Sequence, residues 1–202
     1  MEAKNSKLEY FDIKNLPLVV DVVVPLWSPP IGDKEFKRFN VEYIVRMNMF
    51  DNDLNYQLVD ADDGTLLSSA FLAKKGDASK ADEWFAETSK KYSDNLKIAS
   101  KMSHDYIELM DKRTFTLMND DDIKLSLFVS RKPGCGSLII DRLLPMLHKE
   151  GFKNLYLYTD CDCNWQWYAK RGYTLVQEDI YKPFSDEHEN YKTYIFKKEI
   201  QA

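Results

Sequence analysis

The chain of 202 residues is long enough to bury a hydrophobic core, and its 44% apolar and 13% aromatic content excludes a disordered protein. A formal charge of −5 argues against general nucleic-acid binding, which needs a basic surface. Because we find no signal peptide and no apolar run that could span a bilayer, we expect a cytoplasmic protein with no membrane partner.

The N-terminal third is predicted to contain a strand, two helices and a hairpin. Alternating apolar residues predict a strand over residues 10–14, and the surrounding sequence favours a helix over residues 18–27. Helical spacing and an aspartate N-cap predict a second helix over residues 33–50. An Asp-Gly turn between residues 54–60 and 66–73 is typical of a β-hairpin.

The middle of the chain is predicted to be helical and then to return to strands. Residues 79–113 carry apolar side chains at helical spacing and predict two helices that break near Ser93. Residues 114–118 are a short strand candidate, and residues 123–130 predict a longer strand. The helix that follows ends at Gly151, and a proline inside it is expected to kink or shorten it.

Three further strands are predicted in the C-terminal part. Residues 154–160 are mostly apolar and aromatic, as in a strand buried on both faces. Residues 174–181 and 191–200 form the last two strands, joined by a polar loop. No linker divides the chain, so we expect one domain over residues 1–202, with residues 79–113 as a helical insertion.

The cysteines indicate neither a disulfide framework nor a metal site. Cys161 and Cys163 have no second pair and no nearby histidine, so a four-ligand zinc site cannot be assembled locally. We expect free thiols and no metal. Cys135 lies in a glycine-bearing loop at a helix start, where a thiol can be reactive, although such a residue can also be chosen for its small size.

This loop is the most informative segment. It lies between a predicted strand and a predicted helix and contains two glycines in the run Arg131-Lys132-Pro133-Gly134-Cys135-Gly136-Ser137. Free backbone N–H groups and the positive end of the helix dipole would suit a diphosphate. The glycine and lysine patterns of Rossmann and P-loop nucleotide sites are absent after Gly134, which argues against both.

The loop resembles the Gln/Arg-x-x-Gly-x-Gly/Ala motif of the GCN5-related N-acetyltransferase superfamily. A second block of that family, Asn, then an aromatic-Tyr pair, then Gly-Tyr, matches Asn164, Trp167-Tyr168 and Gly172-Tyr173. The resemblance implies an α/β fold with a central mixed, mostly antiparallel sheet of about seven strands flanked by helices. It also implies a cofactor-binding core at residues 123–181, acetyl-CoA as donor and a primary amine, in a small molecule or a peptide, as acceptor.

The same resemblance assigns roles to individual residues. The backbone of one strand would pair with the pantetheine arm, the loop would hold the phosphates, and an amide side chain would bind the arm. These residues are Leu127, Phe128 and Val129 on the strand, Arg131, Lys132, Gly134, Cys135, Gly136 and Ser137 in the loop, and Asn164. Tyr168 would be the general acid that protonates the thiolate leaving group.

Several points stay open on the sequence alone. No general base is evident: the aspartates at 120–122 are typical of a solvated turn, and a lone histidine such as His104 is more often structural. The acceptor amine is not identified, and a homodimer is possible. The competing interpretation is a catalytically degenerate CoA-binding sensor or protein-interaction module of the same fold.

Overall fold

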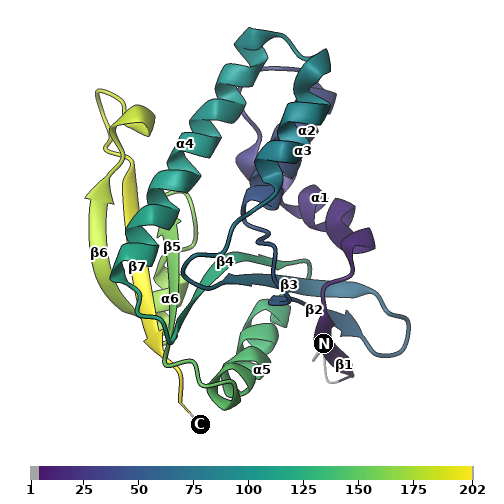
Figure 1. Ribbon diagram of the computed structural model, residues 1–202, viewed down its shortest axis with the longest axis vertical. Helices are drawn as coiled ribbons and strands as arrows, with labels where there is room; N and C mark the ends of the chain where they lie inside the picture. Colours follow the sequence, from purple (N-terminus) through teal and green to yellow (C-terminus); the bar gives the residue numbers. More distant parts are fainter. Residues whose placement is uncertain (1–4, 202) are drawn as a thin grey trace.

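The computed structural model describes residues 5–201 and contains one seven-stranded sheet in the order β1-β2-β3-β4-β5-β7-β6 (Figure 1). Its strands are β1 (Ser6–Tyr10), β2 (Asn55–Asp60), β3 (Leu66–Ala73), β4 (Asp122–Ser130), β5 (Asn154–Asp160), β6 (Thr174–Ile180) and β7 (Lys192–Glu199). Every neighbouring pair is antiparallel except β4 and β5, which are parallel. This confirms the predicted mixed, mostly antiparallel sheet.

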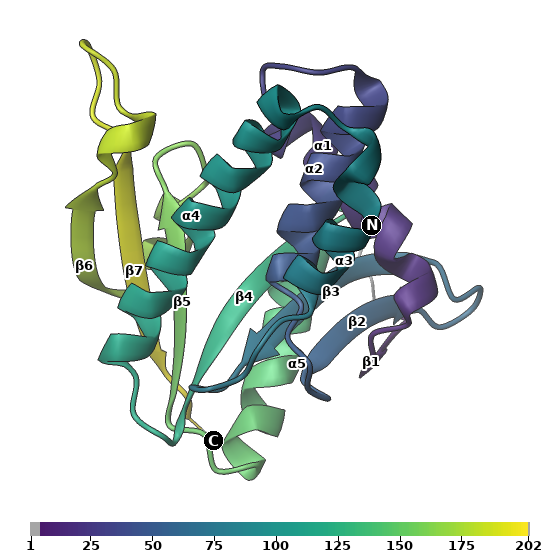
Figure 2. The same ribbon diagram turned by 45° about the horizontal axis from the view of Figure 1, so that its top comes forward.

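Helices cover both faces of this sheet. They are α1 (Leu16–Trp27), α2 (Lys34–Met47), α3 (Ala81–Thr88), α4 (Asp94–Leu117), α5 (Cys135–Lys149) and α6 (Gln166–Lys170). Figures 1 and 2 show α1, α2 and α4 on one face and α5 on the other. In residues 5–201 no helix combines the length and apolar character that crossing a membrane requires.

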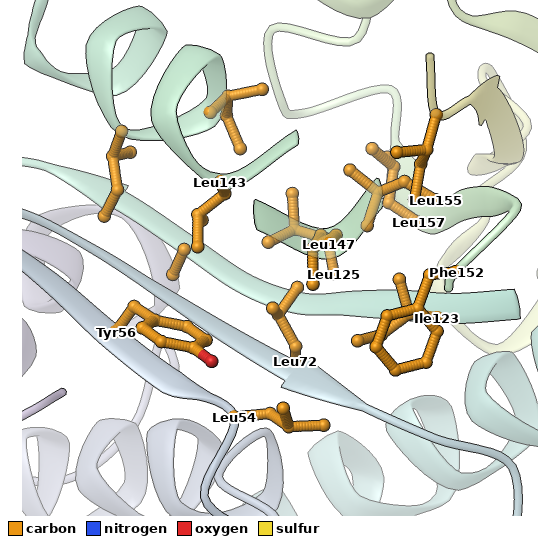
Figure 3. Close-up of a cluster of buried hydrophobic side chains, with 14 of the residues drawn as sticks. Leu54, Tyr56, Leu72, Ile123, Leu125, Leu143, Leu147, Phe152, Leu155 and Leu157 are labelled. Carbon is orange, nitrogen blue, oxygen red and sulfur yellow. The ribbon is translucent and has the colours of Figure 1, made fainter. Parts of the chain in front are cut away.

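The face under α5 holds the largest hydrophobic cluster. Leu143 and Leu147 of α5 are buried and lie over Leu72 of β3 and Leu125 of β4 (Figure 3). The predicted effect of the proline inside α5 was a kink or a shorter helix. The helix continues past Pro145 to Lys149, so the proline does not end it. Burial of a leucine side chain contributes roughly 1.5–3 kcal/mol, which is why this face fixes α5 on the sheet.

The opposite face is covered in two parts. Under α1, valine side chains of the helix pack on Leu127 and Val129 of β4. Over β5 and β7, helix α4 packs Ile107 and Met110 against Tyr156. Helix α4 therefore completes the helical layer on the α1–α2 side of the sheet.

Two predicted strands are wrong. Residues 10–14 are not a strand: β1 ends at Tyr10, and Ile13–Asn15 form a short 3-10 helix because the Asp12 carboxylate accepts a hydrogen bond from the Lys14 amide. Residues 114–118 are not a strand either, since α4 continues to Leu117. The hydroxyl of Thr114 donates to the Met110 carbonyl one turn earlier, so this β-branched residue is accommodated in the helix.

Candidate active site

The parallel strands β4 and β5 part soon after they meet. They pair only at Asp122–Asn154, Ile123–Leu155 and Lys124–Tyr156, although β4 runs on to residue 130 and β5 to residue 160 (Figure 2). We call the diverging ends, residues 125–130 and 157–160, the wedge. Backbone groups that β4 directs toward β5 along this stretch have no strand partner, and strand backbone that lacks a partner can bind an extended ligand.

A bulge in β4 lies at the start of the wedge. Phe71 of β3 pairs with Leu127, whereas Leu72 pairs with Leu125, so Ser126 is the extra residue. Bulges bend a strand and increase its local twist, which favours the separation from β5. The buried Ser126 hydroxyl oxygen has no hydrogen-bond partner within residues 5–201. Sequence reasoning missed this residue, because a bulge leaves no mark in the alternation of a strand that is largely buried.

A buried ion pair lies at the point where the strands part. The Lys124 ammonium is fully buried and forms an ion pair with Asp111 of α4. The rings of Phe50 and Phe115 lie 4.7 and 4.8 Å from the ammonium nitrogen. Burial lowers the pKa of Lys124 and raises the pKa of Asp111, while each charge opposes the shift of the other. This pair fixes α4 to β4 beside the wedge.

The glycine loop lies at the open end of the wedge. Gly134 has a φ of +84° and is the N-cap of α5, with open space where a side chain would begin. A β-carbon on Gly136 would lie 2.8 Å from the Phe128 ring, so the glycine is needed for the loop to approach β4. Residues 131–134 are exposed, as an anion-binding loop requires.

Only part of the loop can offer free amide groups. The Cys135 amide donates to the Lys132 carbonyl at 3.2 Å, and Pro133 has no N–H. The amides of Gly136 and Ser137 have no hydrogen-bond partner in the described chain, and the first turn of α5 contains no acidic residue. A fifteen-residue helix therefore presents two unpaired donors and its positive end at this position.

Arg131 and Lys132, the charged residues of the loop, differ in the contacts that their side chains make. The Arg131 guanidinium donates to the Leu66 carbonyl at 3.2 Å, while the Lys132 side chain is exposed and its charge is among the influences that lower the pKa of the Asp63 carboxyl. The Cys135 side chain is 2% exposed and packs in the core under α5, so it cannot meet a ligand in solvent. Its place in the loop is explained by its small size.

Tyr168 lies on α6, the helix that follows β5 in the chain. Its ring contacts the rings of Trp167, Tyr173 and Phe196. Burial raises the pKa of Tyr168 well above its ordinary value, so the hydroxyl keeps its proton. The Trp167 ring lies at a tilt against the Phe128 ring, with ring centres 5.6 Å apart, and so links α6 to β4. The side chain of Asn164, just before α6, is exposed.

A carboxylate that sequence reasoning missed ends β5. Asp160 Oδ2 accepts a hydrogen bond from the Tyr106 hydroxyl of α4 at 3.0 Å, and the Tyr191 hydroxyl and the Cys163 thiol also interact with this carboxylate. The sequence shows only an aspartate directly after a strand rich in aromatic residues. That position alone does not predict a binding site, because Tyr106 lies far from Asp160 in the sequence and only the fold brings the two residues together.

The two other candidates for proton chemistry lie apart from these groups. The His104 ring is near the carboxylates of Asp82, Asp105 and Glu108 and contacts no residue of the wedge. Of the aspartates at 120–122, Asp122 is buried at the start of β4 and accepts hydrogen bonds from Asn119 and Asn154. Residues 5–201 contain no group of three or more His, Cys, Asp or Glu side chains arranged to hold a metal ion.

Two hollows in the molecular surface lie outside the wedge. One, of about 430 Å³, is lined by residues near the C-terminal end of β7, including Lys153 and Thr174. The other, of about 390 Å³, lies among α2, α3 and α4 and includes Tyr43 and Ile98. Neither is lined by β4, the glycine loop or α6. The candidate site is defined by unpaired backbone and free amides.

No protein-family model and no curated protein sequence matches the chain. Solved structures match its fold. The ribosomal-protein-S18-alanine N-acetyltransferase of Escherichia coli has a TM-score of 0.54 and 12% identity, with 98% of this chain and 95% of that chain covered. A GCN5-related N-acetyltransferase from Kribbella flavida gives 0.57 and 11%, with 98% and 99% covered.

The C-terminal condensation domain of Ebony, solved with beta-alanyl-dopamine, is also similar. It has a TM-score of 0.60 and 10% identity, with 96% of this chain and 99% of that chain covered. Identities this low establish the fold alone. Together with the parting of β4 and β5 beside the glycine loop, these matches show that the chain has the fold of the GCN5-related N-acetyltransferases.

Proposed function

We propose that the protein is an N-acetyltransferase that moves an acetyl group from acetyl-CoA to a primary amine. The observation that carries this proposal is the juxtaposition of unpaired β4 backbone with the free amides of Gly136 and Ser137 at the start of α5. An extended arm that ends in a diphosphate is a ligand that needs both features.

The donor would be held along β4 and the loop. The backbone of Leu127, Phe128 and Val129 would pair with the pantetheine arm, and the Asn164 amide would bind it from the other side. Gly136 and Ser137 would donate to the diphosphate, and the exposed ammonium of Lys132 would add an opposite charge. Bound there, acetyl-CoA supplies an activated thioester.

Tyr168 would act as the general acid. A neutral amine that attacks a thioester expels a thiolate, and a protonated phenol near the sulfur can donate a hydrogen bond or a proton to it. Burial keeps the Tyr168 hydroxyl protonated at neutral pH, which supports this assignment. Proton transfer of this kind contributes about 10²–10⁴-fold in rate.

Primary amines are the proposed acceptors. Structures with the same fold include an agmatine N-acetyltransferase, a Drosophila polyamine N-acetyltransferase and a mosquito arylalkylamine N-acetyltransferase-like protein. Their TM-scores of 0.51, 0.53 and 0.51 and identities of 10–12% leave the acceptor of this chain open. We propose a small amine rather than a protein N-terminus as the first class to assay.

The test combines binding and turnover. Acetyl-CoA should raise the melting temperature of the folded protein, because a ligand that binds only the native state stabilises it. Free thiol should then appear when a primary amine is added. Stabilisation without thiol release for any amine would favour the CoA-binding module instead, and no response to acetyl-CoA would contradict the proposal.

A further inference from the structure

Asp160 lies at the end of β5, on the face covered by α4. Its carboxylate is bonded to the Tyr106 hydroxyl at 3.0 Å and to the Asp162 amide at 3.2 Å. The Tyr191 hydroxyl and the Cys163 thiol approach the same group. Four donors from three separate segments therefore meet one half-buried carboxylate at the edge of the wedge.

None of these four donors carries a positive charge. Burial, together with the charge of Asp160, raises the pKa of the Cys163 thiol to about 12 and raises the pKa of Tyr106 and Tyr191 further. All three side chains are therefore neutral at physiological pH. No lysine, arginine or histidine within residues 5–201 forms an ion pair with Asp160. Its hydrogen bonds are satisfied, but its charge is not neutralised by any neighbour.

Aromatic rings surround this charge. Tyr106 packs near Tyr181, Phe184 and Tyr191, with ring centres 5.0, 5.3 and 6.1 Å away. These rings come from the end of β6 and from the connection to β7, and Tyr158 of β5 lies beside them. The electron-rich faces of tyrosine and phenylalanine attract a cation, and their bodies cover apolar carbon.

The carboxylate is linked through the chain to the proposed general acid. Asp160 ends β5, and the short segment 161–165 leads directly into α6, which carries Tyr168. Asp160 lies on the sheet face that α4 covers, where Tyr106 donates to it, whereas the Tyr168 ring packs against Phe196 in the cluster on the α5 face. A thioester bound in the wedge would lie between these two faces, with Asp160 on the α4 side and Tyr168 on the other.

We propose that Asp160 binds the acceptor amine as its ammonium ion and accepts the proton that the nitrogen loses during acyl transfer. This inference rests on the proposed function and supplies the base that the sequence did not reveal. The Cys163 thiol, the weakest of the four donors, is the one that an entering ammonium displaces. An ammonium would give Asp160 the opposite charge that it lacks.

The reaction balances with these two residues. The amine nitrogen forms the new C–N bond and the C–S bond of the thioester breaks. The bound ammonium first loses one proton through Asp160 to solvent, which frees the lone pair for attack. The second nitrogen proton passes to Asp160 as the C–S bond breaks, and Tyr168 gives its proton to the departing sulfur. The tyrosinate then regains a proton from Asp160, through the site or through solvent, so an ammonium ion and a thioester give an N-acetylamine, free thiol and one proton released to solvent.

The same charge defines a substrate class. A carboxylate on the carbon next to the amine would lie close to Asp160 and would be repelled. Free amino acids should therefore be poor acceptors. Amines that lack this carboxylate and have an apolar or cationic body should be good acceptors, because the aromatic rings around Tyr106 can pack against apolar carbon and can also attract a cation.

Two matched substrate pairs test this specificity. Agmatine and arginine differ by one carboxylate, as do 2-phenylethylamine and phenylalanine. We expect kcat/KM for the amines to exceed that for the corresponding amino acids by at least about 100-fold, as for a buried charge facing a like charge. Equal values within either pair would overturn the proposed specificity.

The residue itself is tested by Asp160→Asn against Asp162→Asn. The control removes the same charge from an exposed neighbour two positions away, whereas Asp160→Asn keeps a side chain that can still accept the Tyr106 hydrogen bond. We expect Asp160→Asn to lower kcat/KM for agmatine by roughly 100-fold. KM for acetyl-CoA and the rise in melting temperature that acetyl-CoA causes should both stay unchanged. A variant that only disturbed the structure would change these two values as well. Equal activity of the two variants would overturn the proposal.

A binding experiment decides the case in which no amine is turned over. Agmatine titrated onto the protein saturated with CoA should raise the melting temperature of the wild type and of Asp162→Asn, but not of Asp160→Asn. No agmatine response in the wild type would overturn the role of Asp160. If CoA itself gives no shift, the proposed function fails, and the same agmatine titration on the protein alone still decides the ammonium site.

Discussion

The two sides of the wedge are built in different ways. The proposed donor side, comprising β4, the glycine loop and α6, comes from one continuous stretch of about fifty residues, in which each element leads into the next. The proposed acceptor side joins α4, the end of β5 and the β6–β7 connection, so that Tyr106, Asp160 and Tyr191 meet only after folding. The proposal for the donor could therefore start from local sequence, whereas the proposal for the acceptor needed tertiary contacts.

The largest expected effect comes from separating the two sides. Lys124→Met removes the ammonium that pairs with Asp111 and leaves a buried carboxylate without a partner. We expect a loss of about 3–5 kcal/mol in the free energy of unfolding, measured by urea denaturation. The double variant Lys124→Met/Asp111→Leu should recover most of the loss. Equal instability of the two proteins would show that the ion pair is not what joins α4 to β4.

On the donor side, Gly134→Val should abolish stabilisation by acetyl-CoA. Gly134 has a φ of +84° and open space at its β-position, so the variant strains the loop without a clash in the core. Gly151→Val is the matched control, because Gly151 follows the other end of α5, has a φ of +93° and is equally unobstructed. Both should lose comparable stability. Loss of CoA binding in both would mean that the effect is not local to the loop.

Tyr168→Phe should separate chemistry from donor binding. We expect a fall of about 100-fold in kcat with an unchanged thermal shift on addition of acetyl-CoA, because the ring contacts with Tyr173 and Phe196 do not need the hydroxyl. The assay is thiol release with 2-phenylethylamine at saturating concentration. Full turnover by this variant would remove Tyr168 from the mechanism.

The smallest expected effect is on the acceptor side. Tyr106→Phe keeps the ring that packs on Tyr181 and Phe184 but removes the hydrogen bond to Asp160. We expect KM for agmatine to change by less than about tenfold, in keeping with one hydrogen bond to a charged group, while KM for acetyl-CoA stays the same. A larger change in KM for acetyl-CoA than in KM for agmatine would contradict the division of the site into two sides.

The success of the sequence predictions also differs between locally encoded features and those that depend on tertiary contacts. The hairpin over β2 and β3, the loop, α5 and the β5–α6 block were predicted because their signals are local, namely turn residues, periodicity and glycines. The strand proposed at residues 114–118 failed because Thr114 bonds back into its own helix and is fully buried in that position. Propensity alone could not weigh that packing.

Features that depend on pairing between distant segments were invisible in the sequence. The bulge at Ser126 exists only as a shift in register against Phe71 and Leu72. Asp160 could be recognised only once the fold brought Tyr106 and Tyr191 to it. The predicted role of Cys135 shows the same limit, since its amide is already bonded to Lys132 and its thiol lies in the core.

The most direct measurement compares acetyl-CoA with S-acetylpantetheine, which has the same thioester arm but no diphosphate. If the Gly136 and Ser137 amides and the start of α5 hold the diphosphate, acetyl-CoA should raise the melting temperature far more than S-acetylpantetheine, and Gly134→Val should abolish the difference. Equal shifts with the two compounds, or no shift with either, would contradict the account.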